Sequence, residues 1–191
     1  MLAQQEINQL VTHLQQGNII LYPTETIWGL GCDALNPNAV EQLSQLKKRQ
    51  SDKSYVLLLD SLTQLQNYVE YVPRKASGLI LYHDEPLTII YKKPIGLPEA
   101  VLAKDGSVAI RVTKDPFCKA VIEAFGRPIV STSANISGEP YPNSFHEISD
   151  PIKNGVHYAA DYKRDIISSL KPSTIVALDD NEDLVFLRKG Y

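Results

Sequence analysis

The chain has 191 residues, of which 43% are hydrophobic and 21% are charged, and its formal net charge is −3. This length and apolar content fit a single domain over residues 1–191 with one substantial core, and they exclude a disordered chain. The slightly negative charge excludes a protein that coats nucleic acid through bulk positive charge, so any anion-binding site must be local.

Neither the cysteines nor the histidines have the spacing of a metal site. Cys32 and Cys118 are far apart, and the four histidines are scattered without a neighbouring carboxylate pattern. We therefore expect no structural metal, and reduced thiols in a cytoplasmic protein. The first residues lack the basic and apolar regions of a signal peptide. No apolar run reaches the ~18 residues of a membrane span, so we expect a soluble protein with no membrane association.

The N-terminal part of the chain predicts helices and strands in alternation. Ile7, Leu10, Val11 and Leu14 have helical spacing and indicate an amphipathic helix that Gly17 ends. The next elements expected are a strand over 19–22 that Pro23 stops, a helix that Asn36 caps and Pro37 opens, a strand over 56–59, and a helix from Ser61 to about Tyr68.

The C-terminal part continues this alternation. The expected elements are strands over 88–92 and 108–112, a helix from Asp115-Pro116 to Gly126, a strand at 129–130, a helix start at the capping-box sequence Ser144-Phe145-His146-Glu147, and closing strands over 173–179 and 184–188. The whole pattern predicts one layered α/β domain.

The segment from Pro128 to Gly138 has the most unusual composition. An apolar strand-like run ends in four hydroxyls, those of Ser131, Thr132, Ser133 and Ser137, together with the amide of Asn135. Such side chains donate and accept hydrogen bonds, so they can hold carboxylates, ribose hydroxyls or phosphates without a permanent charge. Locally, an ordinary turn is the alternative.

Two further segments could contribute to the same site. Tyr22 to Thr26 presents hydroxyls after a strand, and Gly29 and Gly31 would permit close backbone approach to a ligand; a strand-to-loop turn beside a packed Trp28 is the alternative. Residues 47–53 hold four cations and one aspartate, a local charge of +3, which suits a polyphosphate but also the end of an ordinary helix.

Two single arginines are also candidates. Arg111 interrupts an apolar strand, where a charge needs either a structural carboxylate or a ligand carboxylate. Arg188 is either a frayed terminal residue or another phosphate contact. The chain has no Walker loop, no dinucleotide-binding glycine motif and no Gly-x-Ser-x-Gly elbow, so ligand binding is a better role for Ser133 than nucleophilic attack.

Taken together, five segments resemble the YrdC family over nearly the whole chain. They are Tyr22-Pro23-Thr24-Glu25-Thr26, the Lys47-x-Arg49 pair, Ala109-Ile110-Arg111-Val112, Ser131-Thr132-Ser133-Ala134-Asn135-x-Ser137-Gly138 and Ser173-Thr174. The Lys-x-Arg and Ser-x-Asn pairs are the specific signature. The resemblance implies a single-domain, twisted mixed α/β sheet that is flanked by helices and surrounds a concave, positively charged cavity.

The resemblance also implies a reaction. L-Threonine, bicarbonate and ATP, the last with Mg²⁺, would give L-threonylcarbamoyl-AMP and pyrophosphate, for N6-threonylcarbamoyladenosine formation on tRNAs that read ANN codons. The tRNA would be reached only indirectly, through a separate threonylcarbamoyl transferase complex. The alternative is a noncatalytic RNA-binding or regulatory paralogue of the same fold.

By similarity, the site residues divide into two groups. Those implied for ATP are Lys47, Arg49, Ser107, Ser133, Asn135 and Arg188, with Lys47 and Arg49 as the catalytic pair. Those implied for threonine are Thr24, Arg111, Ser131 and Ser173. The chain departs from the family where Trp-Pro-Gly-Pro is usual, since it has His83-Asp84-Glu85-Pro86, and where Gln50 and Ser54 replace prolines.

Overall fold

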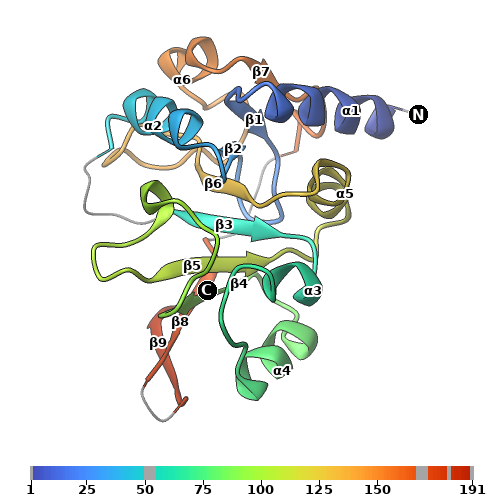
Figure 1. Cartoon of the computed structure of the whole chain (residues 1–191). Helices are drawn as coiled ribbons and strands as arrows, with labels where there is room; N and C mark the ends of the chain where they lie inside the picture. Colours follow the sequence, from blue (N-terminus) through green and yellow to red (C-terminus); the bar gives the residue numbers. More distant parts are fainter. Residues whose placement is uncertain (1, 50–54, 167–171, 180–181, 190–191) are drawn as a thin grey trace.

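In a computed structural model, which describes residues 2–49, 55–166, 172–179 and 182–189, the protein is a layered α/β domain (Figure 1). Strands in this part of the chain form one nine-stranded mixed sheet in the order β7-β1-β2-β6-β3-β5-β4-β8-β9. The predicted fold class, a mixed α/β sheet with flanking helices, is confirmed. Gln50, Ser54 and the end of the basic run at Lys53 lie outside the described residues.

Most strands are short, and parallel and antiparallel neighbours are mixed. The strands are β1 (Ile20–Tyr22), β2 (Gly29–Asp33), β3 (Val56–Leu59), β4 (Leu87–Tyr91), β5 (Val108–Val112), β6 (Ile129–Ser133), β7 (Tyr158–Ala159), β8 (Thr174–Leu178) and β9 (Leu184–Arg188). The pairs β1–β7, β3–β5 and β4–β8 are parallel, and the other neighbours are antiparallel.

Capping residues mark the start of α2 and α5, two of the helices that flank the sheet. The helices are α1 (Leu2–Gln15), α2 (Pro37–Leu46), α3 (Leu62–Leu65), α4 (Arg74–Tyr82), α5 (Pro116–Phe125), α6 (Asp150–Gly155) and the 3₁₀ turn η1 (Glu99–Val101). Asn36 accepts hydrogen bonds from the first amides of α2, and Asp115 does the same for α5. Gly126 ends α5 with φ 75°, a left-handed conformation that suits glycine.

Alternation along the strands sends apolar side chains to two cores, one on each face of the sheet. Leu57, Ile110 and Val130 belong to the core beneath α2, α3 and α4. Leu58 and Ile129 point the other way and pack against the apolar sides of α1 and α5. Cys32 and Cys118 are free and buried in these cores, as predicted.

The apolar core on the second face lies under α1 and α5. Further along the same face, β6 presents Ser131, β3 presents Val56 and β5 presents Arg111, all with the same orientation as Ile129 and Leu58 by strand alternation. This uncovered part of the sheet carries the polar groups of the candidate site.

Three local predictions were wrong. The first concerns the hydroxyl run, which was expected after a strand at 129–130: Ser131, Thr132 and Ser133 are themselves part of β6. They pair with β2, a strand that was not predicted because its sequence contains two glycines. Residues 144–147 do not start a helix, since Glu147 accepts hydrogen bonds from Asn143 and α6 begins only at Asp150. The helix after Ser61 ends at Leu65, before the predicted Tyr68.

Among the described residues, no helix combines the length and apolar character needed to cross a bilayer.

Gly31 lies in β2 where the side chain of Tyr22, from the neighbouring strand β1, packs against its Cα. A Cβ there would lie 2.8 Å from Cε1 of Tyr22 and 3.0 Å from the carbonyl oxygen of Val130, so this glycine serves packing and not ligand approach. We expect Gly31→Ala to lower the free energy of unfolding by roughly 1–3 kcal/mol through overpacking. Chemical denaturation measures this.

Gly78 in α4 provides the matched control, because a Cβ there meets nothing within 4 Å. Gly78→Ala should raise the free energy of unfolding by up to about 1 kcal/mol through helix propensity. Equal effects of the two substitutions would contradict the packing argument.

Candidate functional site

A cavity of about 290 Å³ lies on the uncovered part of the sheet. We call it the arginine cavity, because three arginines and no carboxylate-bearing residue line it within the described part of the chain. Its lining residues are Thr24, Thr26, Ile27, Gly29, Arg49, Val56, Arg111, Ser131, Thr132, Ser133, Tyr141, Pro172, Ser173 and Arg188. Seven of the ten predicted site residues therefore meet at one cavity, and they come from segments far apart in the sequence.

The turn after β1 brings Thr24 to the cavity wall. Its Oγ1 donates to the carbonyl of Ile27 at 2.7 Å and accepts from the amide of Thr26 at 3.1 Å, which closes the turn locally. Gly29 then passes close beneath, since a Cβ there would lie 3.3 Å from Cγ2 of Thr24 and 3.5 Å from Oγ of Ser131. The Thr24 hydroxyl thus shapes the turn and also borders the cavity.

Lys47 lies at the C-terminal end of α2 but does not line the arginine cavity. Its side chain is almost fully buried, and Nζ donates to the carbonyls of Ser133 at 2.5 Å and Asn135 at 2.6 Å. Burial and the nearby Arg49 lower the pKa of Lys47 to about 7. Lys47 therefore ties the end of α2 to the polypeptide that leaves β6.

Arg49 reaches the cavity because the chain turns sharply at the end of α2. Lys48 has φ 50°, in the left-handed region, and the amide of Arg49 donates back to the carbonyl of Ser44 at 2.9 Å. The Arg49 guanidinium then lies over the ring of Tyr55, 4.3 Å from its centroid. Lys48, the middle residue of the Lys-x-Arg motif, therefore turns the chain so that the side chains of Lys47 and Arg49 point in different directions.

Arg111 is paired with a carboxylate of the protein. Its Nε lies 3.3 Å from Oε1 of Glu25 as an ion pair without hydrogen-bond geometry, since Nε is buried with no hydrogen-bond partner among the described residues; its Nη1 donates to Oγ1 of Thr26 at 3.5 Å. Only 6% of the Arg111 side chain is exposed, so a compensating charge is required. The structural carboxylate left open by the sequence is therefore Glu25, and Arg111 lines the cavity as well.

Arg188 is held by β8 and is not a frayed end. Its Nε and Nη2 donate to the carbonyl of Ser173 at 3.1 and 2.8 Å. The Ser173 hydroxyl shares a hydrogen bond of 2.8 Å with Oγ1 of Thr88. Burial first, and Arg111 next, lower the pKa of Arg188, which indicates that the two guanidinium groups lie near each other.

Two predicted residues, like Lys47, lie outside this cavity. Ser107 precedes β5 on the same face as Arg111, and its hydroxyl donates to Oδ1 of Asp105 at 2.6 Å. Asn135 lines a neighbouring cavity of about 180 Å³, and its Nδ2 donates to the carbonyls of Ile136 and Glu139. Oδ1 of Asn135 is buried without a hydrogen-bond partner among the described residues, so it is available as an acceptor.

The sequence did not predict Ile27, Val56, Tyr141 and Pro172 as lining residues, or Glu25 as the partner of Arg111. Tyr141 lies in the proline-containing loop 138–143 and borders both the arginine cavity and the Asn135 cavity. Nothing in its local sequence marks it as a site residue. Glu25 was visible inside the Tyr22–Thr26 segment, but only the tertiary structure shows its contact with Arg111.

In the part of the chain that the structure describes, no group of three or more histidine, cysteine, aspartate or glutamate side chains could hold a metal ion. What the site offers instead is positive charge and neutral hydroxyls. Such a set binds an anionic ligand that has both carboxylate or phosphate groups and hydroxyl or amine groups.

Comparisons with known proteins agree with this geometry. The family model Sua5/YciO/YrdC, which carries the description "Telomere recombination", matches residues 12–190. A protein of Pseudoalteromonas translucida named threonylcarbamoyl-AMP synthase is 34% identical over 175 residues, which are 90% of this chain and 92% of that protein.

Two solved structures are similar over nearly the whole chain. Sua5 of P. abyssi, crystallised with L-threonine, superposes with a TM-score of 0.85 at 28% identity; the match covers 95% of this chain and 53% of that one, so the present chain spans about half of its length. YciO of E. coli superposes with a TM-score of 0.83 at 28% identity, covering 98% of this chain and 90% of that one.

The lowered pKa of Lys47 predicts a pH dependence of stability. Between pH 7 and its ordinary value of 10.5, the unfolded chain binds more protons at Lys47 than the folded protein does. This group therefore makes the free energy of unfolding rise with pH across that window. We expect Lys47→Met to reduce this rise in denaturation series from pH 7 to 10.

The neighbouring exposed Lys48 is the control, and Lys48→Met should keep the wild-type slope. An unchanged slope in Lys47→Met would show that the burial of its ammonium group does not govern the effect.

Proposed function

The chain belongs to the Sua5/YciO/YrdC family, and on that premise we propose that it is an L-threonylcarbamoyl-AMP synthase, an enzyme of the nucleotidyltransferase type. The observation that carries the proposal is the convergence of Arg49, Arg111 and Arg188 on one cavity lined with hydroxyls. The substrates would be L-threonine, bicarbonate and ATP, and the products L-threonylcarbamoyl-AMP and pyrophosphate.

We assign the amino acid to the side of the cavity formed by Thr24, Arg111, Ser131 and Ser173. The Arg111 guanidinium suits a carboxylate, and the hydroxyls can bind the amine and hydroxyl groups of threonine. The complex of P. abyssi Sua5 with L-threonine supports this choice of amino acid. Bicarbonate is a further anion that the same positive charge would attract.

We assign the triphosphate to Arg49 and Arg188, which border the same cavity from two different elements. Ser107, Ser133 and Asn135 would contact other parts of ATP. Oδ1 of Asn135, which has no hydrogen-bond partner in the described part of the chain, could accept from a nucleotide hydroxyl or amine. The nucleotide would arrive as MgATP, in which the metal ion shields the charge of the leaving pyrophosphate. The described lining residues include no carboxylate, which fits a metal that enters with the phosphates.

In the proposed reaction, the threonine amine and bicarbonate form a carbamate by making a nitrogen–carbon bond and losing one water molecule. An oxygen of this carbamate then attacks the α-phosphorus of ATP. One phosphorus–oxygen bond forms as the bond to pyrophosphate breaks, and negative charge develops on the phosphate oxygens. Arg49 and Arg188 would stabilise that charge from fixed positions. Lys47 would act on the nucleotide through the polypeptide of Ser133 and Asn135, to which its ammonium group is bonded.

The product is a reactive mixed anhydride, and it would pass to a separate threonylcarbamoyl transferase complex that modifies tRNA in the cytoplasm. The alternative, a noncatalytic RNA-binding or regulatory paralogue, has less support. Both signature pairs are present, and the relatives that match over most of this chain are named as synthases.

The direct test is pyrophosphate release by the purified protein with L-threonine, bicarbonate and MgATP. We expect release that requires both threonine and bicarbonate, with L-threonylcarbamoyl-AMP identified by mass spectrometry. Release that does not depend on threonine would contradict the proposal. Tight RNA binding with a steep salt dependence, and no such product, would favour the alternative.

Arg188 provides a residue-level test. We expect Arg188→Ala to lower kcat/KM by about 30- to 1000-fold, because loss of one transition-state donor costs ~2–4 kcal/mol. The exposed Lys93, whose ion pair with Glu70 lies away from the cavity, is the control, and Lys93→Ala should keep wild-type kinetics. Steady-state pyrophosphate assays over a range of MgATP concentrations measure both, and similar losses in the two variants would argue against a role in the site.

A further inference from the structure

We propose that Glu25 is a positioning residue for threonine binding: it holds the Arg111 guanidinium from behind, so that the cation presents a fixed edge to the substrate carboxylate. This inference rests on the proposed function, since it specifies how one group of that site is held. It begins with the geometry of the ion pair, in which Oε1 of Glu25 lies 3.3 Å from Nε of Arg111.

The Glu25 carboxylate is itself fixed by a second contact. Oγ1 of Thr113 donates to Oε2 of Glu25 at 2.7 Å, so the two oxygens of the carboxylate have different partners. Thr113 is buried, and its hydroxyl accepts from the amide of Asp115 at 3.2 Å. Asp115 caps the start of α5. The position of Arg111 is therefore linked through two side chains to the end of a helix.

The ion pair with Glu25 lies on the Nε side of the guanidinium and is a charge contact, because Nε has no hydrogen-bond partner among the described residues. A ligand carboxylate that binds two guanidinium nitrogens needs that group in one fixed plane, because the two parallel hydrogen bonds form only in a narrow geometry. The side chain of Arg111 is only 6% exposed, so its charge also needs a permanent partner when no substrate is bound. Glu25 meets both needs.

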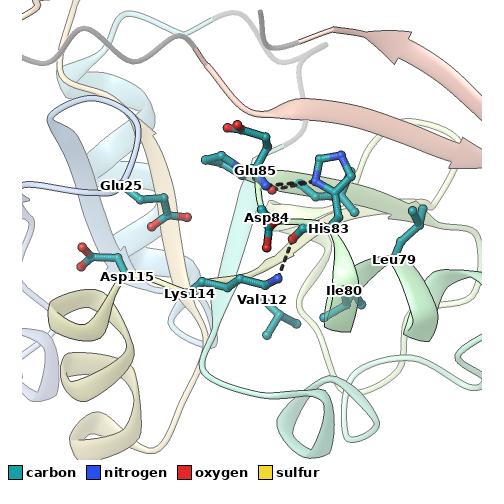
Figure 2. A pocket seen from close by; sticks show the side chains of 11 residues that line it. Glu25, Leu79, Ile80, His83, Asp84, Glu85, Val112, Lys114 and Asp115 are labelled. Carbon is teal, nitrogen blue, oxygen red and sulfur yellow. Dashed lines mark hydrogen bonds between the residues drawn. The ribbon is translucent and has the colours of Figure 1, made fainter.

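Glu25 also lines a second cavity, which no arginine of the described residues borders. This acidic cavity, of about 300 Å³, is lined by Glu25, Leu79, Ile80, His83, Asp84, Glu85, Pro86, Leu87, Val112, Lys114 and Asp115. Figure 2 shows the Glu25 and Asp115 carboxylates on one side of it and Lys114 directed toward the His83 carbonyl. Lys114 is thus engaged with the end of α4, and Arg111 is the cation that pairs with Glu25.

The acidic cavity determines the consequence of losing Glu25. Removal of the Glu25 carboxylate leaves Asp84 and Glu85 in the same cavity, and these negative charges would draw the Arg111 guanidinium away from the substrate. Asp115 also lines the cavity, but its Oδ2 lies 3.6 Å from Nζ of Lys163 and its Oδ1 caps α5. Residues 83–85, where the sequence differs from the usual family pattern, line this same acidic cavity. We therefore expect Glu25 to keep the Arg111 guanidinium directed toward the substrate and away from the other carboxylates of the acidic cavity.

The test is the affinity for threonine with and without its carboxylate. In Glu25→Ala we expect the KM for L-threonine to rise about tenfold or more, with the KM for MgATP changed by less than about twofold. Binding of L-threoninol, which lacks the carboxylate, should be the same in the variant and the wild type by calorimetry. A general distortion of the site would weaken both ligands equally, and that result would overturn the inference.

A double-mutant cycle makes the test specific to Arg111. In an Arg111→Met background, Glu25→Ala should cause no further loss of threonine affinity, because the two changes then remove one interaction. Additive losses would contradict the positioning role. If Glu25→Ala folds poorly, Thr113→Val keeps the charge and removes only the supporting hydroxyl; it should give a smaller rise in the threonine KM with the same insensitivity to threoninol.

The exposed Glu85, which lines the same acidic cavity, is the control. Glu85→Gln should leave the threonine KM unchanged, and an effect equal to that of Glu25→Ala would mean that the general negative charge of the cavity matters instead. If the wild type shows no threonine-dependent pyrophosphate release, the proposed function fails. If the wild type shows threonine-dependent pyrophosphate release and Glu25→Ala has the same KM for threonine, only the positioning role fails.

Discussion

Three arginines gather on the uncovered part of the sheet and Lys47 is buried behind β6; the mutual repulsion of these four cations is the constraint that the rest of the site satisfies. Each cation is held by a different group: Lys47 by two carbonyls after β6, Arg49 by the ring of Tyr55, Arg111 by Glu25 and Arg188 by the carbonyl of Ser173. Partial burial strengthens the interactions of the three arginine charges because little water screens them, whereas burial lowers the pKa of Lys47 to about 7. The same burial requires that every one of them has a fixed partner.

The fold makes this concentration of charge possible by covering the second face of the sheet unevenly. The helices α1 and α5 bury Leu58 and Ile129, while the continuation of the same strands carries Val56 and Ser131 into the cavity. A core and a polar site therefore share one sheet face. Strand alternation alone cannot achieve this division; it depends on where the helices end.

The ion pair of Arg111 and Glu25 connects the two cavities. Arg111 lines the arginine cavity together with Arg188, and its partner Glu25 lines the acidic cavity with a group of carboxylates. In such an arrangement, small displacements of one guanidinium change the charge that the substrate meets. The Thr113 contact limits those displacements by fixing the carboxylate of Glu25 at its second oxygen.

The sequence by itself determined the α/β class, most helix and strand positions, and the residue types of the site. Capping residues such as Asn36, Asp115 and Gly126 act within one turn of chain, so their effect can be read locally. The capping box at Ser144 and the hidden strand β2 show the limit of such signals. Glu147 finds a different partner, and the two glycines of β2 are explained only by side chains from distant segments packed against them.

Only the tertiary structure decided which charges face the cavity and which support them. Lys47 and Arg49 are two residues apart, yet one is bonded behind β6 and the other borders the cavity, because a left-handed residue turns the chain between them. Arg111 finds its partner in Glu25, in a distant segment near the start of the chain. Contacts at such separations depend on the order of the strands in the sheet, which pairwise spacing in a sequence does not contain.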